Sequence, residues 1–148
     1  MKLKKVQLDD WELLRTLEEA SATKMYAPCE GEEGYKKYIE ESTVYFIMDK
    51  KNAVGTISYE IQKDGKCVIN GLTVKPEHRS RGIARQAMEY LLNEIDDREI
   101  ELVVHPENIP ALLIYLHLGF IITKWEDNHF GDGEPRLHLK KKSRKGRS

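Results

Sequence analysis

Three β-like segments that follow one another closely over residues 42–74 constrain the fold of this chain more than any other feature. The segments STVYFIMD, AVGTISYEI and KCVINGLTV are rich in β-branched and aromatic residues, which favour strands. Short polar turns, KKN and KDG, separate them, and turns of this length join neighbouring antiparallel strands. We therefore expect an antiparallel meander at the centre of the fold.

The elements on both sides of the meander predict a mixed α/β (α+β) fold. At 148 residues the chain fits one domain with a single sizeable core. Helices are expected where apolar residues recur at helical spacing, and strands where they alternate. In chain order we expect a strand at 3–8, a helix at 11–20 capped by Asp9 and Asp10, a helix or lid-like segment at 32–41, the meander, a helix from Gly82, a strand at 99–105, a helix from Asn108 to Gly119, and a closing hairpin of 120–127 and 136–142.

The turn after the meander, within VKPEHRSRGIAR, has the properties of an anion site. A strand that enters a helix through a glycine turn points free backbone N–H groups at one spot, where the helix dipole adds about half a positive charge. Arg79 and Arg81 can add charge, and Gly82 lets a ligand approach the backbone. Neither G-x-x-x-x-G-K-S/T nor G-x-G-x-x-G is present. The alternative is an ordinary strand-to-helix turn with a solvated basic rim.

Two motifs of the sequence resemble one family. The pattern V-x-P-x-x-R-x-R-G-x-A at residues 74–84 resembles the acetyl-CoA pyrophosphate loop, Q/R-x-x-G-x-G/A, of the GNAT superfamily of N-acetyltransferases. The pattern N-x-x-A-x-x-x-Y-x-x-x-G-F at 108–120 resembles the family's next motif, in the same order and spacing. The resemblance implies a GNAT fold over residues 1–139, with a mixed, mostly antiparallel central sheet of about seven strands flanked by about four helices.

The resemblance also implies that acetyl-CoA is the cosubstrate and indicates which residues bind it. The glycine loop would bind the pyrophosphate through backbone N–H groups, with Arg85 at its rim. The preceding strand would pair its backbone with the pantetheine arm and supply the oxyanion donor, and the Asn108 amide would hold the same arm. The implied cofactor-binding residues are Leu72, Thr73, Val74, Arg79, Ser80, Arg81, Gly82, Ile83, Ala84, Arg85 and Asn108.

Tyr115 is the candidate general acid. Asn108 and Tyr115 are seven residues apart, which is two helical turns, so both side chains lie on one face and one ligand can contact both. Expulsion of CoA as a thiolate, with a pKa near ~8.5, calls for an acid of similar or higher pKa, and tyrosine at ~10 qualifies. The alternative is a core tyrosine on an amphipathic helix.

The general base is harder to identify. Many relatives place a glutamate on the strand before the pyrophosphate loop or on the strand before the second motif, and those positions correspond here to Asn70 and Val103. The remaining candidates are His105, Glu101 and Glu60. The alternatives are that these three are surface or ion-paired residues and that a water relay removes the proton.

The resemblance implies transfer of the acetyl group to a primary amine by direct attack in a ternary complex, and neither Cys29 nor Cys67 occupies a plausible position for a nucleophile. A weak base favours amines of low pKa. An α-amine at ~7.7–8.0 is about a tenth neutral near pH 7, whereas a lysine amine at ~10.4 is under about a thousandth neutral. The segment NHFGDGEPRL resembles N-Y-Y-x-D-G-E-D-A of the protein N-terminal acetyltransferases, although His129-Phe130 and Pro135-Arg136 depart from it.

Other functions stay open at this point. The acceptor could be a small-molecule amine such as a polyamine, an amino acid or an antibiotic, and the D-G-E turn could simply be good hairpin chemistry. The missing carboxylate also allows a catalytically weak acyl-CoA-binding regulatory module. The oligomeric state, a homodimer included, is not constrained by the sequence.

Charge and composition bound the partners. Residues 140–148, KKKSRKGRS, hold six basic residues, and the other 139 carry 18 Lys and Arg against 25 Asp and Glu. We expect a disordered basic tail, and nucleic-acid binding through it is the less favoured interpretation. No apolar run approaches the ~20 residues of a membrane span, and no signal peptide is apparent, so we expect a cytoplasmic protein. The histidines lie at no recognisable ligand spacing, so we expect no metal.

Overall fold

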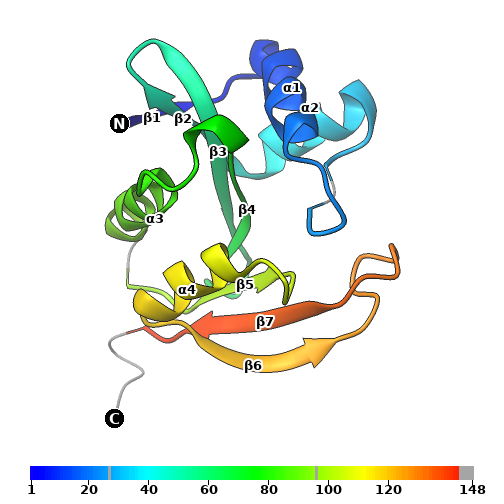
Figure 1. Ribbon diagram of the computed structural model, residues 1–148, viewed down its shortest axis with the longest axis vertical. Helices are drawn as coiled ribbons and strands as arrows, with labels where there is room; N and C mark the ends of the chain where they lie inside the picture. The colour runs from blue at the N-terminus through cyan, green and yellow to red at the C-terminus, as the bar shows by residue number, and fades with distance from the viewer. Residues whose placement is uncertain (27, 96, 144–148) are drawn as a thin grey trace.

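One seven-stranded sheet with helices on both faces makes up the fold (Figure 1). The computed structural model describes residues 1–26, 28–95 and 97–143. Within them, the mostly antiparallel sheet and the four α-helices confirm the expected fold class. The elements are β1 Lys2–Lys5, α1 Trp11–Ala20, α2 Gly31–Glu41, β2 Thr43–Asp49, β3 Asn52–Ile61, β4 Cys67–Val74, α3 Ile83–Glu94, β5 Ile100–Val104, α4 Ile109–His117, β6 Ile121–Glu126 and β7 Arg136–Lys141, with 3-10 turns at Leu8–Asp10 and Pro76–His78.

The sheet consists of two halves that meet at one parallel pair of strands. Its order is β1-β2-β3-β4-β5-β7-β6, and β2, β3 and β4 form the predicted antiparallel meander. Every neighbouring pair is antiparallel except β4 and β5, which pair only over Cys67–Ile69 and Ile100–Leu102. Figure 1 shows the β1–β4 half above and the β5–β7 half below. The two halves therefore diverge beyond this short contact.

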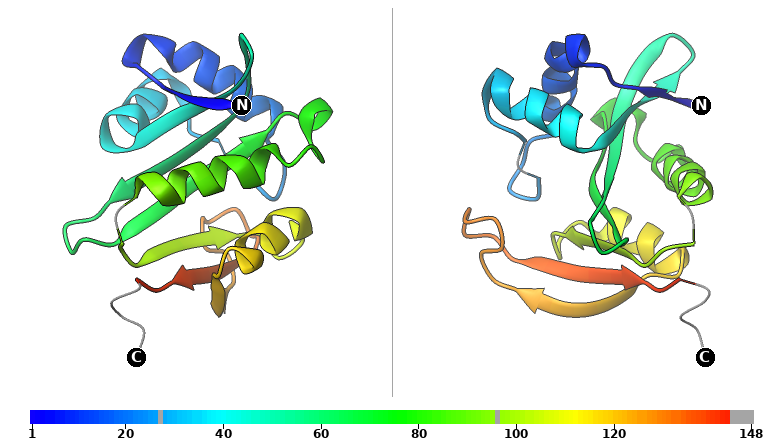
Figure 2. Two further views of the ribbon diagram at one scale, coloured as in Figure 1. Left: turned by 90° about the vertical axis from the view of Figure 1, so that its left-hand side faces the viewer. Right: turned by 180° about the vertical axis from the view of Figure 1, so that it is seen from behind.

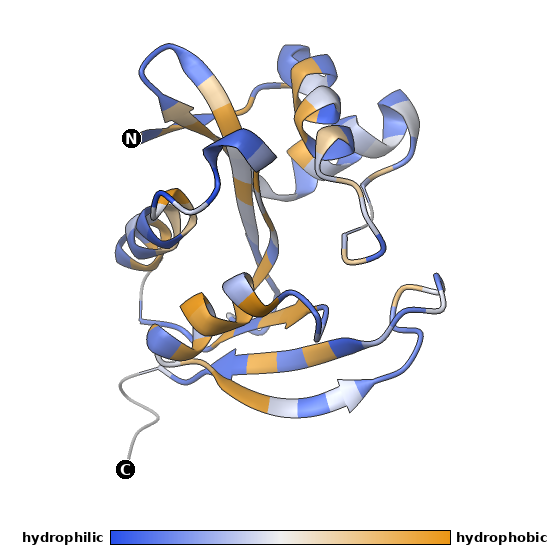
Figure 3. Ribbon diagram, in the orientation of Figure 1, coloured by the Kyte–Doolittle hydropathy of each residue, from blue (hydrophilic) through white to orange (hydrophobic). Residues whose placement is uncertain are grey.

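Helices cover the β1–β4 half on both faces. Figure 2 shows α1 and α2 on one face and α3 on the other. The apolar stripe that predicted α3 is buried, with Ile83, Ala87, Met88 and Leu91 in the main core. The face under α1 and α2 has its own apolar cluster. Figure 3 shows that α4 is hydrophobic over most of its length, and its Tyr115 belongs to the main core.

The N-terminal elements differ from the expectation in two respects. Strand β1 ends at Lys5 rather than continuing to residue 8, because Leu8–Asp10 forms a 3-10 turn. The predicted cap of α1 by Asp9 and Asp10 is wrong, since no side chain caps that helix. Asp10 Oδ2 instead accepts a hydrogen bond from the backbone N of Gln7 at 2.9 Å, so this carboxylate holds the preceding turn.

The start of the predicted basic tail is also corrected. Lys140 and Lys141 belong to β7, where they pair with Ile121 and Ile100 respectively. The Lys140 Nζ lies 3.3 Å from a carboxylate oxygen of Glu99. Pairing on both edges of β7 explains why these lysines are ordered. Residues 144–148 lie outside the described part of the chain. In that described part, no helix has the length and apolar character needed to cross a membrane.

Candidate active site

A cavity of about 660 Å³ opens where β4 and β5 separate. Its wall includes Ile69–Val74 from β4 and Leu102–His105 at the end of β5. The start of α3 and the inner face of α4 form one end, and the α1–α2 region forms the other. A volume of this size is typical of sites for cofactors and small molecules.

A β-bulge in β4 accompanies the separation. Ser58 of β3 pairs with Gly71, whereas Tyr59 pairs with Ile69, so Asn70 is the extra residue. Such a bulge bends its strand and increases the local twist. Beyond Ile69, β4 keeps its antiparallel partner β3 up to Val74 but has no partner on its β5 side among the described residues. The backbone edge of 70–74 therefore faces the cavity, and the predicted Leu72, Thr73 and Val74 all lie in its wall.

The predicted anion loop forms the wall at the N-terminus of α3. Ser80 and Gly82 have φ angles of 66° and 76°, a left-handed conformation that favours glycine. The first hydrogen bond of the helix runs from Gln86 N to Gly82 O, so the preceding N–H groups have no intrahelical acceptor. No acidic residue occupies the first turn. These features suit an anion.

The charged side chains of the loop have different surroundings. Arg79 Nε donates to the carbonyl O of Val74 at 2.9 Å and so fastens the loop to the end of β4. Arg85 lies at the cavity and pairs with Glu89 at 3.0 Å. Arg81 is not in the wall, unlike its predicted companions Arg79, Ser80, Gly82, Ile83, Ala84 and Arg85. A Cβ added at Gly82 would meet no atom within 4 Å, so the space next to this glycine is open to a ligand.

Asn108 and Tyr115 both lie in the cavity wall, as their helical spacing predicts. Asn108 caps α4, with its Oδ1 accepting from Ala111 N at 3.4 Å, and this arrangement leaves the amide nitrogen to donate elsewhere. Tyr115 is only 6% exposed, and its ring lies edge-on to Phe120 with centroids 5.8 Å apart. Burial raises the pKa of Tyr115 above its ordinary value of 10, so the phenol holds its proton at neutral pH.

The structure brings only one of the three base candidates to the cavity. His105 is 2% exposed and lies in the wall. Its Nδ1 accepts from Glu107 N at 3.1 Å, so the tautomer that fits has the proton on Nε2, which donates to Glu134 Oε1 at 2.8 Å. Glu101 pairs with Lys66 at 3.3 Å, outside the wall. Glu60 on β3 also lies outside it.

Sequence reasoning missed a glutamate at the opposite end of the cavity. Glu18 of α1 lies in the wall and is 1% exposed. Burial raises its pKa from the ordinary value of 4.5 to about 7, against a smaller lowering by the hydroxyl of Tyr26. The signal that could have found it is its position four residues after Leu14 and one after Leu17, on the buried face of the helix.

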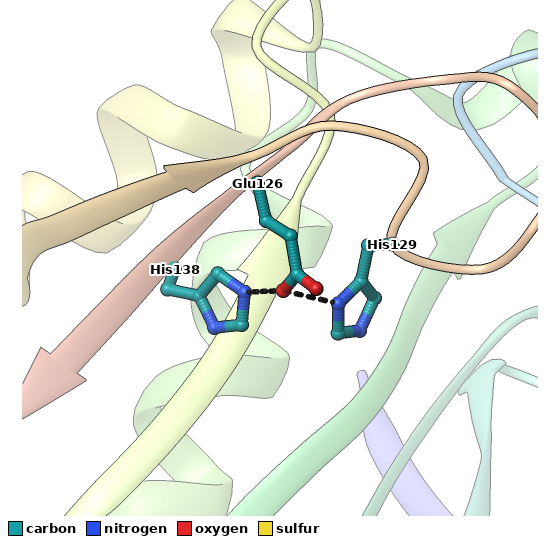
Figure 4. A group of neighbouring side chains, drawn as sticks. All are labelled: Glu126, His129 and His138. Carbon is teal, nitrogen blue, oxygen red and sulfur yellow. Dashed lines mark hydrogen bonds and ion pairs between the residues drawn. The ribbon is translucent and has the colours of Figure 1, made fainter.

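The β6–β7 hairpin holds a second polar cluster, shown in Figure 4. Glu126 Oε1 accepts from His129 Nδ1 at 2.8 Å and from His138 Nε2 at 2.7 Å. These three side chains offer one oxygen and two nitrogens close enough together to hold a metal ion, a grouping that the linear histidine spacing did not reveal. The distances between the carboxylate oxygen and the two ring nitrogens are hydrogen-bond lengths. The cluster therefore stabilises the β6–β7 hairpin, whose Phe130 lies in the cavity wall.

Comparisons with known proteins agree on one family. The model of the acetyltransferase (GNAT) family matches residues 11–120. The N-terminal acetyltransferase B complex catalytic subunit NAA20 of Arabidopsis thaliana is 26% identical over 118 residues, which cover 72% of this chain and 67% of that protein.

Solved structures share the fold at lower sequence identity. The ribosomal-protein-S18-alanine N-acetyltransferase from Escherichia coli superposes with a TM-score of 0.78 at 16% identity, covering 95% of this chain and 92% of that one. An N-acetyltransferase from Staphylococcus aureus Mu50 gives 0.80 at 16% identity, with 95% and 96% covered. A chimera of spermidine N-acetyltransferase SpeG from Vibrio cholerae and hSSAT gives 0.76 at 18% identity, with 95% of each chain covered.

Proposed function

From its membership of the GNAT acetyltransferase family, we infer that this chain moves an acetyl group from acetyl-CoA to a primary amine by direct attack in a ternary complex. The observation that carries the inference is the continuous cavity from the anion loop at α3, along the unpaired edge of β4, to the α1–α2 region. A long cofactor with an anionic end and an amide-rich arm fits this shape. The acceptor then enters from the other end.

Each section of the cavity has groups suited to one part of acetyl-CoA. The free N–H groups before Gln86 bind the pyrophosphate, with Arg85 beside it. The backbone of Leu72–Val74 pairs with the pantetheine amides as a neighbouring strand would. The amide nitrogen of Asn108, left unused by its cap, donates to the same arm.

The chemistry needs an oxyanion donor and an acid. A backbone N–H on the cavity side of β4 near the bulge stabilises the negative charge of the tetrahedral intermediate, and the pairing of β4 with β3 on its other edge holds this donor in place. Loss of one such donor raises the activation barrier by about 3–4 kcal/mol. Tyr115 stays protonated in its buried position and gives its proton to the departing thiolate.

For the acceptor we propose the N-terminal α-amine of a protein or peptide. The similarity to a catalytic subunit of an N-terminal acetyltransferase supports this choice. So does the GDGEP turn, because the carboxylate of Glu134 accepts from Nε2 of His105, a residue of the cavity wall, at 2.8 Å. A small-molecule amine is the second candidate, favoured by the likeness of fold to spermidine N-acetyltransferases.

The cofactor part is tested by calorimetric titration of acetyl-CoA into wild type and Gly82→Glu. The variant adds a side chain and a negative charge to an open space at a helix start, so binding should be lost. Gly31→Glu is the matched control: Gly31 also has a positive φ, open surroundings and a helix start, but lies outside the cavity wall. Retained micromolar affinity in Gly82→Glu would contradict the cofactor site.

The acceptor part is tested by thiol release from acetyl-CoA. Peptides with varied first residues, polyamines, aminoglycosides and free amino acids form the panel. Release with peptides that have a free α-amine, and none with their N-acetylated forms, is the expected result. Tight CoA binding without thiol release on any member would instead favour a regulatory acyl-CoA-binding module.

A further inference from the structure

Glu18 is the only buried carboxylic acid among the described residues. Its Oε1 has no hydrogen-bond partner there, and the side chain lies in the wall of the cavity. An ionised carboxylate in such a place is costly unless a cation or several donors satisfy it. The position is therefore incomplete without a further group.

The described residues supply no cation to Glu18. In the described part of the chain, no lysine or arginine forms an ion pair with it. Among the described residues, the Tyr26 hydroxyl donates to Glu18, and the charge of Glu18 raises the pKa values of Tyr26, Cys29, Tyr35 and Tyr38, which are neutral when protonated. A cation from outside the chain would satisfy the charge of this carboxylate.

Glu18 is also close to the strand that is proposed to hold the reacting end of acetyl-CoA. A Cβ built on Gly71 would lie 3.5 Å from the hydroxyl of Tyr26 and 3.6 Å from that of Tyr38. Gly71 directly precedes Leu72 at the β4 bulge, and the Tyr26 hydroxyl donates to Glu18. One tyrosine hydroxyl therefore connects the carboxylate to the bulge.

We propose that Glu18 is the carboxylate that binds the ammonium group of the acceptor and removes its proton, so that the acceptor is a primary amine that enters as a cation. This inference rests on the proposed acetyl transfer and assigns its base to α1. Glu101 and Glu60 lie outside the cavity wall, and both ring nitrogens of His105 are hydrogen-bonded. The Glu18 carboxylate lies in the wall, and its Oε1 has no hydrogen-bond partner among the described residues.

The proton and electron changes balance as follows. Glu18 Oε1 takes one proton from R–NH3⁺ and leaves R–NH2 with a free electron pair. That pair forms the C–N bond to the thioester carbonyl carbon, and the C–S bond breaks with its electrons on sulfur. Tyr115 gives its proton to the sulfur and regains one from the nitrogen, which becomes the amide. Glu18 then releases its proton to water, so the sum is R–NH3⁺ plus acetyl-CoA to R–NH–acetyl, CoA–SH and H⁺.

The acidity of Glu18 favours α-amines over lysine-like amines. A carboxylate whose acid has a pKa of about 7 takes a proton from an α-ammonium group of pKa ~8 with an equilibrium constant that is unfavourable by only about tenfold. For a lysine ammonium group of pKa ~10.4 the equilibrium constant is unfavourable by about 2,500-fold. A base that titrates close to neutral pH is also half ionised under working conditions. Both considerations agree with an N-terminal acceptor.

The first test compares wild type, Glu18→Gln and Glu19→Gln in the thiol-release assay. Glu19 neighbours Glu18 on the same helix but is exposed, so Glu19→Gln controls for the loss of one charge. We expect Glu18→Gln to lower kcat/KM about 100-fold at pH 7 while the Kd for acetyl-CoA changes less than twofold, and Glu19→Gln to match wild type.

The pH profile separates a base from a merely structural residue. For wild type, kcat/KM should rise through pH about 7 as Glu18 ionises and fall above the pKa of the acceptor amine. For Glu18→Gln it should only rise, through the pKa of the amine. Turnover within threefold of wild type at every pH overturns the inference alone. Absence of acetyl-CoA binding by wild type overturns the proposed function and this inference with it.

A second measurement requires no turnover. The thermal midpoint of the wild-type complex with CoA should rise with L-leucinamide, which carries an α-ammonium group, and not with N-acetyl-leucinamide, which is neutral. Glu18→Gln should lose this response and Glu19→Gln should keep it. No rise for wild type, or an equal rise for Glu18→Gln, would contradict the assignment.

Discussion

Replacement of Glu18 by glutamine should stabilise the protein progressively as the pH rises. Glutamine has nearly the same shape but cannot ionise, so it removes the burden of keeping a carboxylate charged in a buried position. The free energy of unfolding of Glu18→Gln relative to wild type should increase between pH 4.5 and pH 8. The glutamine amide also forms or lacks hydrogen bonds of its own, and because it does not titrate, it changes the difference in free energy of unfolding by the same amount at every pH.

The size of the change follows from the pKa of Glu18. Burial raises it from 4.5 to about 7, and each pKa unit corresponds to about 1.36 kcal/mol. Because the folded-state pKa lies above the unfolded one, the contribution of this group to stability is full below pH 4.5 and is lost as the pH rises through about 7. The loss in wild type amounts to roughly 3 kcal/mol. Since Glu18 is 1% exposed, solvent screening reduces this loss of stability only slightly.

Urea unfolding of both proteins, followed by circular dichroism at several pH values from 4.5 to 8.5, measures this difference. All other titrating groups cancel between the two proteins, provided that they do not touch Glu18. Its neighbours Tyr26, Cys29, Tyr35 and Tyr38 have pKa values raised above their ordinary ones, so they stay neutral throughout. Glu19→Gln should show no such trend. A pH-independent difference between Glu18→Gln and wild type would refute the reasoning.

Three further outcomes are expected. Tyr115→Phe should lower kcat about 100-fold and leave the Kd for acetyl-CoA nearly unchanged; wild-type turnover would remove the acid assignment. Gly55→Ala should destabilise by about 3 kcal/mol, because a Cβ there would lie 2.1 Å from the carbonyl O of Thr73, whereas Gly34→Ala in α2 should be neutral or stabilising in the same urea titration. Hydrogen bonds from His129 and His138 lower the pKa of Glu126. Wild type should therefore lose stability relative to Glu126→Gln as the pH falls below about 4, and a difference in the free energy of unfolding that does not change with pH would contradict a stabilising role of this cluster.

The parts of the fold that are predictable from the sequence are those with a local physical cause. The meander follows from alternating β-branched residues and short turns, and the buried stripe of α3 follows from its 3.6-residue period. The anion loop and the Asn108–Tyr115 pair are likewise contiguous or two helical turns apart. Each of these features depends on neighbours within one segment. The opening between β4 and β5 does not, because it depends on a one-residue bulge at Asn70 and on where two distant strands stop pairing.

The same distinction explains the base candidates. Glu101 lies on the same predicted strand as His105, yet its ion pair with Lys66 on the turn before that strand's partner β4 depends on long-range folding. The histidines of the hairpin gave no linear ligand spacing, and only the pairing of β6 with β7 brings His138 to Glu126. Side chains that meet across strands are invisible to periodicity. The candidates on β3 and β5, Glu60 and Glu101, therefore lie outside the cavity wall.

Glu18 illustrates why a polar residue on an apolar helix face should be examined first. Its place after Leu14 and Leu17 predicts burial, while its chemistry opposes burial by roughly 3 kcal/mol at neutral pH. Packing alone would favour a leucine or glutamine there. Two local rules in conflict at one position are expected where function compensates for the loss of stability. Greater stability together with lower turnover in Glu18→Gln would be the joint signature of such a compromise, whereas loss of both would indicate a residue that only supports the fold.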